Sequence, residues 1–229
     1  MKPGREIETA APLGERFAAF IEDSGFPCVG AKAALKTGSL KIVAARDLRS
    51  GWNDLDIHKA VVDWAADYRR EPEGLRSLAV LFDGPADLDE QEFEVALWAR
   101  LQSLADKDAW KGIGFDRRVE ADPDDPHFSI SLGGEAFFVV GLHPGASRPA
   151  RRFERPALVF NLHDQFERLR AEGRYERMRE RILDRDRALA GSVNPMLERH
   201  GDASEAAQYS GRRVGADWTC PFRDPRAKT

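Results

Sequence analysis

The spacing of apolar side chains predicts that this chain mixes helices and strands. Apolar residues recur every three or four positions in four long segments, which predicts amphipathic helices over 14–23, 54–70, 87–107 and 164–189, the last one interrupted near Gly173. Short apolar runs bounded by Gly, Pro and Asp predict strands over 40–46, 78–82, 127–132, 135–142 and 156–161. A short helix is also expected over 30–37, and the pattern of 40–46 does not exclude a helix there.

The order of these elements indicates the kind of sheet that they form. Only Gly133 and Gly134 separate two expected strands, which is the spacing of a β-hairpin and leaves no room for a crossover helix. We therefore expect an α+β fold in which helices flank a largely antiparallel sheet. Residues 1–229 are expected to form a single domain, with a polar start over 1–13 and a long, turn-rich arm over 191–229.

Charge and composition narrow the classes of function. The 229 residues are 42% hydrophobic and carry a formal net charge of −4, so a large core is expected and a nucleic-acid partner is not. The charge is unevenly distributed, because residues 143–187 contain twelve Arg and no Lys against eight acidic residues. Arg in place of Lys favours planar recognition of anions, although a salt-bridged helix surface explains much of this stretch.

The chain is expected to act in the cytoplasm and without a membrane. No apolar run approaches the length that crosses a bilayer, and the first residues lack the apolar stretch of a secretory signal. The two cysteines, Cys28 and Cys220, lie far apart in sequence without a CxxC pattern. We therefore expect free thiols and no structural zinc site.

One segment brings together the side chains that suit a charged cofactor. His143 follows an expected strand, and Arg148, Arg151 and Arg152 come soon after it. An imidazole nitrogen binds transition metals and a guanidinium binds carboxylates, so this spacing permits a haem site, with one axial ligand and arginines on the propionates. A solvated, Arg-rich turn is the competing interpretation.

Several blocks of the chain resemble the YqcI/YcgG family. They are Phe26-Pro27-Cys28, residues 141–153, 156–170, 191–197 and 208–212, and Trp218-Thr219-Cys220-Pro221-Phe222. Characterised members of that family are haem-dependent enzymes that hydroxylate a guanidino nitrogen of arginine or an arginine-derived compound. The resemblance thus implies a haem b cofactor and a monooxygenase that uses dioxygen and an external reductant.

The resemblance raises His143 to the first candidate for the axial iron ligand, with the three arginines near it on the propionates or on a substrate carboxylate. Cys28 is the rival ligand, because a thiolate favours O–O cleavage, although a lone Cys is most often a small buried hydrophobe. His163 is the second histidine candidate, as a ligand or as a catalytic hydrogen-bond donor to iron-bound dioxygen.

Other family blocks supply further candidates for the lining of the pocket, namely Asn161, which we group with the catalytic residues, and Gln165, Tyr209 and Arg212. A buried substrate cation requires a carboxylate, for which Glu205 and Glu167 are candidates. The expected partners are a guanidino or amino-acid-like substrate, dioxygen and an electron donor, with a homodimer as a candidate assembly. The alternatives are a non-catalytic haem or small-anion binding protein, and a metal-free protein that binds a partner through its Arg-rich face.

Overall fold

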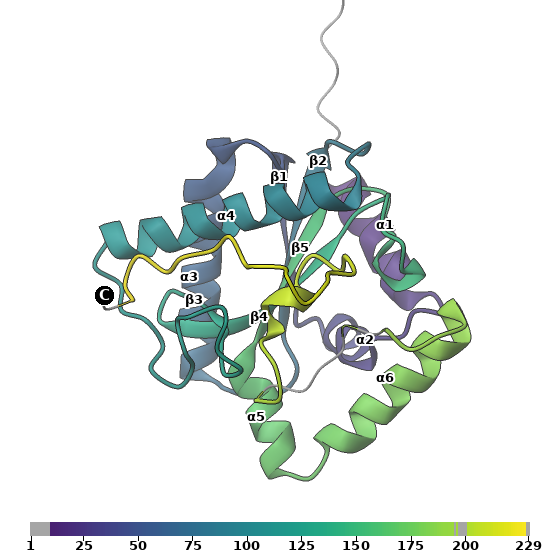
Figure 1. Ribbon diagram of the computed structural model, residues 1–229. Helices are drawn as coiled ribbons and strands as arrows, with labels where there is room; N and C mark the ends of the chain where they lie inside the picture. Colours follow the sequence, from purple (N-terminus) through teal and green to yellow (C-terminus); the bar gives the residue numbers. More distant parts are fainter. Residues whose placement is uncertain (1–9, 195, 197–200, 228–229) are drawn as a thin grey trace, which may run out of the picture.

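The computed structural model describes residues 10–194, 196 and 201–227, and its centre is one five-stranded mixed sheet (Figure 1). The strands are β1 (Leu40–Asp47), β2 (Ser77–Gly84), β3 (Ile130–Leu132), β4 (Glu135–Leu142) and β5 (Ala157–Leu162), and they lie in the order β1-β2-β5-β4-β3. β1 pairs with β2 in parallel, and the other three pairs are antiparallel. The prediction of an α+β fold with a largely antiparallel sheet is confirmed.

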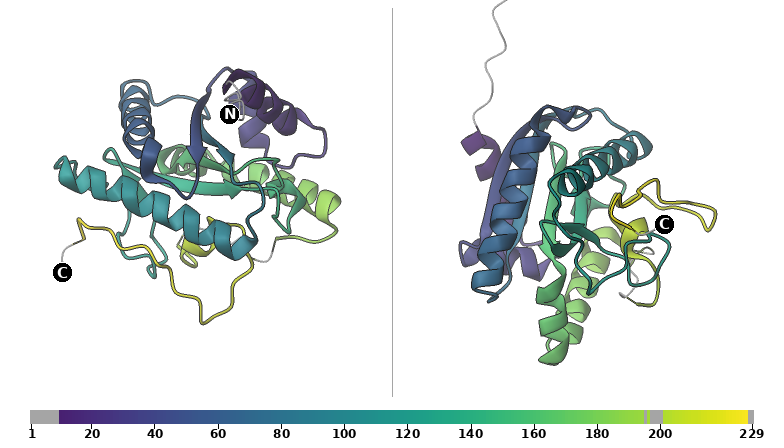
Figure 2. Two further views of the ribbon diagram at one scale, coloured as in Figure 1. Left: turned by 90° about the horizontal axis from the view of Figure 1, so that it is seen from above. Right: turned by 90° about the vertical axis from the view of Figure 1, so that its left-hand side faces the viewer.

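Helices cover both faces of the sheet (Figures 1 and 2). One face carries α3 (Asp54–Arg70) and α4 (Glu90–Trp110), and the other carries α1 (Ala10–Glu22), α2 (Val29–Lys36) and α6 (Tyr175–Ala190). The short α5 (His163–Ala171) continues directly from β5. None of the helices in the described part of the chain has the length and apolarity needed to cross a membrane.

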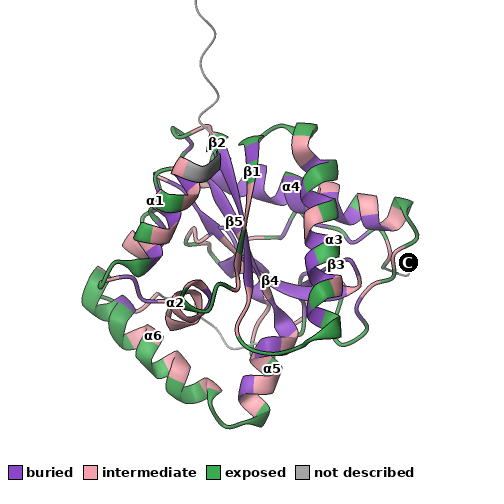
Figure 3. Ribbon diagram, turned by 180° about the vertical axis from the view of Figure 1, so that it is seen from behind, coloured by how far each residue is buried: buried purple, intermediate pink, exposed green. Residues whose placement is uncertain are grey.

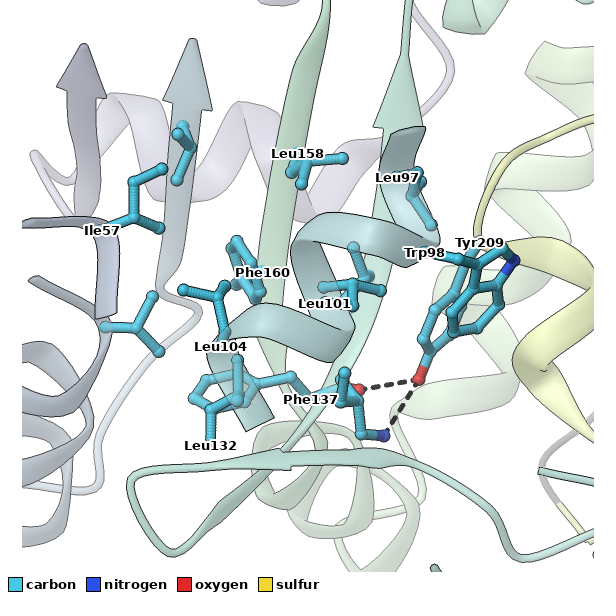
Figure 4. Close-up of a cluster of buried hydrophobic side chains, with 14 of the residues drawn as sticks. Ile57, Leu97, Trp98, Leu101, Leu104, Leu132, Phe137, Leu158, Phe160 and Tyr209 are labelled. Carbon is cyan, nitrogen blue, oxygen red and sulfur yellow. Dashed lines mark hydrogen bonds between the residues drawn. The ribbon is translucent and has the colours of Figure 1, made fainter. Parts of the chain in front are cut away.

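Alternation along the strands divides the buried side chains into two layers. In β4 and β5, Phe137, Val139, Leu158 and Phe160 point to α3 and α4, where they pack with Leu97 and Leu101 (Figure 4). Their neighbours Val140 and Val159 point to the opposite layer, which contains α1 and α2. Because successive side chains of a strand point to opposite faces of the sheet, residues two positions apart join the same layer and adjacent residues join different layers.

Most predicted elements are confirmed, with shifts at their ends. α4 runs from Glu90 to Trp110 instead of 87–107, because Asp89 caps it and forms a reciprocal capping box with Glu92. The break near Gly173 is confirmed, since α5 ends at Ala171 and α6 begins at Tyr175. The hairpin at Gly133 and Gly134 is also confirmed, and both residues have positive φ values, as a type I′ turn requires.

Two predictions about the extent of elements are wrong. The strand expected over 127–132 is shorter in the structure, where β3 begins only at Ile130. A turn takes up the residues before it, because the His127 N–H donates to the Asp125 carboxylate and the Phe128 N–H donates to the Asp125 carbonyl. The polar start expected over 1–13 is too long, because α1 already begins at Ala10, and residues 1–9 lie outside the described part.

The C-terminal arm is turn-rich, as predicted, with η3 (Glu205–Gln208) as its helical turn within residues 191–194, 196 and 201–227. It crosses the α4 side of the molecule (Figure 1), where Tyr209, Cys220 and Phe222 are buried in the core. Burial raises the pKa of the Cys220 thiol to about 12, so this cysteine is a neutral part of the core.

Candidate functional site

A cavity of about 290 Å³ lies between the second sheet face and the helices α1, α2 and α6. Its walls are mostly apolar and include Phe17, Ile21, Phe138, Val140 and Val159. Among the described residues that line it, the ionisable ones at neutral pH are four arginines, two acids and one histidine: Arg148, Arg151, Arg170, Arg179, Asp186, Glu205 and His163. An apolar cavity with a few polar groups is the usual form of a small-molecule site.

Asn161 and His163 lie two residues apart at the end of β5 and both line the cavity. Asn161 pairs with Ser77 on β2 and with Phe138 on β4, so it lies in the middle of the sheet. The Ser77 hydroxyl donates to Asn161 Oδ1 at 2.7 Å, which fixes the amide. The structure therefore brings together the two residues that the sequence analysis grouped as catalytic.

A buried polar network surrounds His163. Ser129 Oγ lies 3.4 Å from His163 Nδ1 and donates to Glu205 Oε1 at 2.6 Å. The Tyr209 hydroxyl lies 2.8 Å from the same carboxylate oxygen. It also lies 2.9 Å from the Phe137 carbonyl and accepts from the Ile130 N–H at 3.3 Å, and these two bonds are the dashed lines of Figure 4. Burial raises the pKa of Tyr209 well above its usual value, so its phenol stays protonated.

The second ring nitrogen of His163 faces the outside of this network. Nε2 lies 3.3 Å from Glu167 Oε1, one helical turn along α5. Glu167 is about half exposed and also pairs with Arg170, so its carboxylate can turn toward solvent. His163 is thus held on one side by buried groups and on the other by a group that can move away.

Arg148 lines the cavity but is occupied by protein partners. Its guanidinium pairs with the buried Asp186 of α6 and donates to the Ser192 hydroxyl and carbonyl. Asp186 also accepts from the Asn194 N–H at 3.1 Å. This pair fastens the last turn of α6 to the Arg-rich turn, so we interpret Arg148 as a structural residue.

Arg151 differs from Arg148 because it has no carboxylate partner among the described residues. It is 8% exposed and donates to three backbone carbonyls, those of Gly141, Gln208 and Tyr209, at 2.8–3.1 Å. Burial lowers the pKa of its guanidinium to about 10, which still leaves it charged at neutral pH. The cavity wall therefore contains a fixed positive charge that no carboxylate of the described residues contacts directly.

Cys28 also lines the cavity, at the start of α2. Its Sγ caps this helix by accepting from the Ala31 N–H at 3.4 Å. Burial raises the pKa of the thiol above its usual value, which favours the neutral form. A thiolate ligand requires the opposite shift, so the surroundings of Cys28 favour a capping role.

The structure separates His143 from the cavity. Its ring is 1% exposed and stacks on Phe93 of α4, with ring centroids 4.2 Å apart and planes at 13°. Gly141 and Gly145 allow this close approach, because a Cβ at Gly141 would lie 2.7 Å from the Phe93 ring and one at Gly145 would lie 2.7 Å from the Leu88 carbonyl. The expectation that His143 and the neighbouring arginines share one site needs correction, since His143 faces the α4 layer.

Gln165 lines the cavity, where its Oε1 accepts from the Arg76 N–H at 2.9 Å. Four other candidates, Arg152, Glu167, Tyr209 and Arg212, lie outside the lining. Arg152 donates to the Ala146 and Ser147 carbonyls and so closes the turn that begins at His143. Arg212 pairs with the buried Glu94 of α4 and holds the arm. Tyr209 stacks on Trp98 in the core and reaches the site only through its hydroxyl.

Ser129, Asp186 and Gln208 belong to the site or its surroundings but were not predicted from the sequence. A usable signal existed for Asp186, because it follows Tyr175, Met178, Ile182 and Leu183 on one stripe of α6 that faces the cavity. This stripe is only half buried, and α6 is coloured mostly as exposed or intermediate in Figure 3, so Asp186 is the buried polar end of a helix face that lines the cavity. For Ser129 we find no such signal.

Metal binding by side chains alone has no support in the described residues, since no three His, Cys, Asp or Glu gather there as a metal-ligating group. Iron in a porphyrin needs only an axial ligand from the chain, and the described cavity lining offers four side chains of a type that ligates haem iron: Cys28, His163, Tyr175 and Met178.

Comparison with known proteins supports one assignment. No curated protein and no solved structure matches the chain. A family model described as the YqcI/YcgG family matches residues 17–223, which includes the whole sheet, the cavity and most of the arm. The chain therefore belongs to the YqcI/YcgG family.

Proposed function

We propose that this protein is a haem-dependent oxygenase that hydroxylates a nitrogen of a guanidino or amino-acid-derived substrate inside the cavity. The observation that carries the proposal is the position of His163, a histidine held by buried partners at the wall of an apolar cavity whose described lining has more arginines than acids. Family membership supplies the expectation of haem, and these residues fit such a group chemically.

The fit rests on three features of the cavity. His163 offers an imidazole nitrogen, with Ser129 and Glu205 placed to fix its ring as outer-shell partners do at metal sites. The apolar walls suit a porphyrin ring, and the uncompensated charge of Arg151 suits a carboxylate. His163 replaces His143 as the ligand in this proposal because only His163 lines the cavity.

Bound haem would supply the activation of dioxygen with electrons from an external donor. The chain's own contribution is to bind, orient and exclude water. Glu205 lines the cavity beside His163, so a cationic part of a substrate would find a carboxylate there, and the apolar walls would keep bulk water from the reacting nitrogen. Asn161, fixed by Ser77, offers an oriented amide to the same space.

Titration of the purified protein with hemin tests this proposal. We expect a stoichiometric Soret band in the wild type and in Cys28→Ala and His143→Ala, and altered axial ligation in His163→Ala. A folded wild type that takes up no hemin would overturn the proposal, and an unchanged His163→Ala spectrum would overturn the ligand assignment.

Turnover separates an oxygenase from the alternative, a non-catalytic haem protein. Hemin-loaded enzyme given dioxygen, a chemical reductant and arginine or its analogues should yield a product that has gained one oxygen atom. Stable hemin binding without oxidation of any guanidino compound would favour the alternative.

A further inference from the structure

We propose that Arg151 forms a carboxylate-binding subsite in the cavity. Arg151 is one of the residues that line the cavity and its guanidinium is buried, and each of its bonds to the described protein goes to a neutral backbone carbonyl: Gly141, Gln208 and Tyr209. A buried charge is stabilised well only when an opposite charge or a full set of hydrogen bonds accompanies it.

The nearby acid does not fill this requirement. Asp186 is committed to Arg148 and to the Asn194 N–H. The two arginines and this one acid therefore leave an excess of one positive charge at this end of the cavity. The other acid of the described lining, Glu205, accepts from Ser129 in the His163 network.

The hydrogen bonds of Arg151 leave part of its donor capacity unused. A guanidinium has five N–H groups, and three of them are used by the carbonyls. The other two have no partner among the described residues. Two N–H groups on one planar guanidinium match the two oxygens of a carboxylate, which is the reason for choosing this class over a compact anion such as chloride.

The neighbouring chain fixes the side chain in this position. Gly211 has a φ of +83°, and a Cβ there would lie 2.8 Å from Arg151 Cδ and 3.1 Å from its Nε. The arm therefore passes directly along the Arg151 side chain, which is held before any ligand enters. Such preorganisation reduces the entropy that a ligand loses on binding.

This inference deepens the proposed function by naming the ligand group that the cavity recognises, but it does not require haem. The test uses the full-length protein without hemin and two probes that differ only in charge, 4-phenylbutyrate and 4-phenylbutanamide, whose phenyl groups suit the apolar walls. Calorimetric titration should give the carboxylate an affinity about tenfold or more above the amide in the wild type, the usual value of a charge-assisted hydrogen bond.

Variants assign the preference to Arg151. Arg151→Gln should reduce it to near unity, whereas Arg179→Gln, a matched loss of charge from a half-buried arginine of the same lining, should preserve it. If Arg151→Gln does not fold, Arg151→Lys serves as the second test. It keeps the charge but loses the planar pair of N–H groups, so it should retain only part of the preference for the carboxylate. Equal affinity for the two probes in the wild type, or an equal loss in both glutamine variants, would overturn the inference.

Two further titrations identify the source of the carboxylate. If a haem propionate occupies the subsite, hemin should bind the wild type more tightly than hemin dimethyl ester and should displace 4-phenylbutyrate. If a substrate carboxylate occupies it, hemin and its ester should bind equally and 4-phenylbutyrate should still bind the hemin-loaded protein. Carboxylate preference without any hemin uptake would remove the haem proposal and leave the Arg151 subsite standing.

Discussion

The imidazole of His143 stacks on the ring of Phe93, with centroids 4.2 Å apart, and so joins the end of β4 to α4. Replacement by Ala removes a buried ring from the core, so His143→Ala should lower the free energy of unfolding by about 2–4 kcal/mol at pH 8. Urea denaturation measures this change. The same variant should bind hemin as the wild type does, which a role as axial ligand would not allow.

The destabilisation caused by His143→Ala should also depend on pH. Burial holds the pKa of His143 below its usual value of about 6.5. As pH falls below that value the unfolded chain takes up a proton at this residue and the folded chain does not, so the wild type loses stability, whereas above it this stability is fully present. The difference between wild type and His143→Ala should therefore shrink from pH 8 to about pH 5.5. A constant or growing difference would contradict the neutral, buried state.

Alternation along β4 and β5 explains which part of the site could be predicted. The sequence identified both strands and both histidines, and it placed Asn161 and His163 two residues apart, which puts them on one face. The same alternation puts His143 on the face of Phe137 and Val139, but the sequence could not show that this face packs on α4 and that the cavity lies on the opposite face. Strand pairing and helix placement settle this, and both depend on residues distant in sequence.

The arginines show a second limit of the sequence. Arg148, Arg151 and Arg152 are close in the chain and are the same type of residue, but their partners differ. Arg148 pairs with Asp186, Arg151 donates to backbone carbonyls, and Arg152 closes a surface turn. Their difference arises from α6 and from the arm, which meet this turn only in the folded chain. Composition could indicate anion recognition but could not say which guanidinium remains without a counter-ion.

Close packing at Gly141 gives a prediction about stability. A Cβ at this position would lie 2.7 Å from the Phe93 ring and 2.8 Å from Leu97 Cδ1, both in the packed core. Gly141→Ala should therefore destabilise the protein by about 1–3 kcal/mol through overpacking. Gly114→Ala is the control, because no atom lies within 4 Å of the added Cβ there. Equal thermal melting of the two variants would contradict the close contact of β4 and α4.

The pair between Asp186 and Arg148 should control the attachment of α6. Asp186→Asn leaves the partly buried Arg148 charge without its carboxylate partner, and the cost of about 3–5 kcal/mol known for fully buried pairs is the upper value for this change. Hydrogen exchange of the α6 amides should accelerate more than exchange in the sheet strands. Asp184→Asn breaks only an exposed pair with Arg187 and should change stability by less than about 0.5 kcal/mol. Unchanged α6 exchange in Asp186→Asn would mean that other contacts hold this helix.

Ser129 and Ser131 allow the role of the His163 network to be separated from general stability. Both side chains are fully buried, but Ser129 links His163 to Glu205, whereas Ser131 accepts from the Asp116 N–H away from the cavity. If His163 holds haem iron, Ser129→Ala removes an outer-shell partner and should weaken hemin affinity about 10–100-fold. Ser131→Ala should lower the melting temperature without changing that affinity. Hemin titration followed at the Soret band measures the affinity of each variant, and thermal melting measures its stability. Equal hemin affinities in the two variants would show that Ser129 does not orient the ligand.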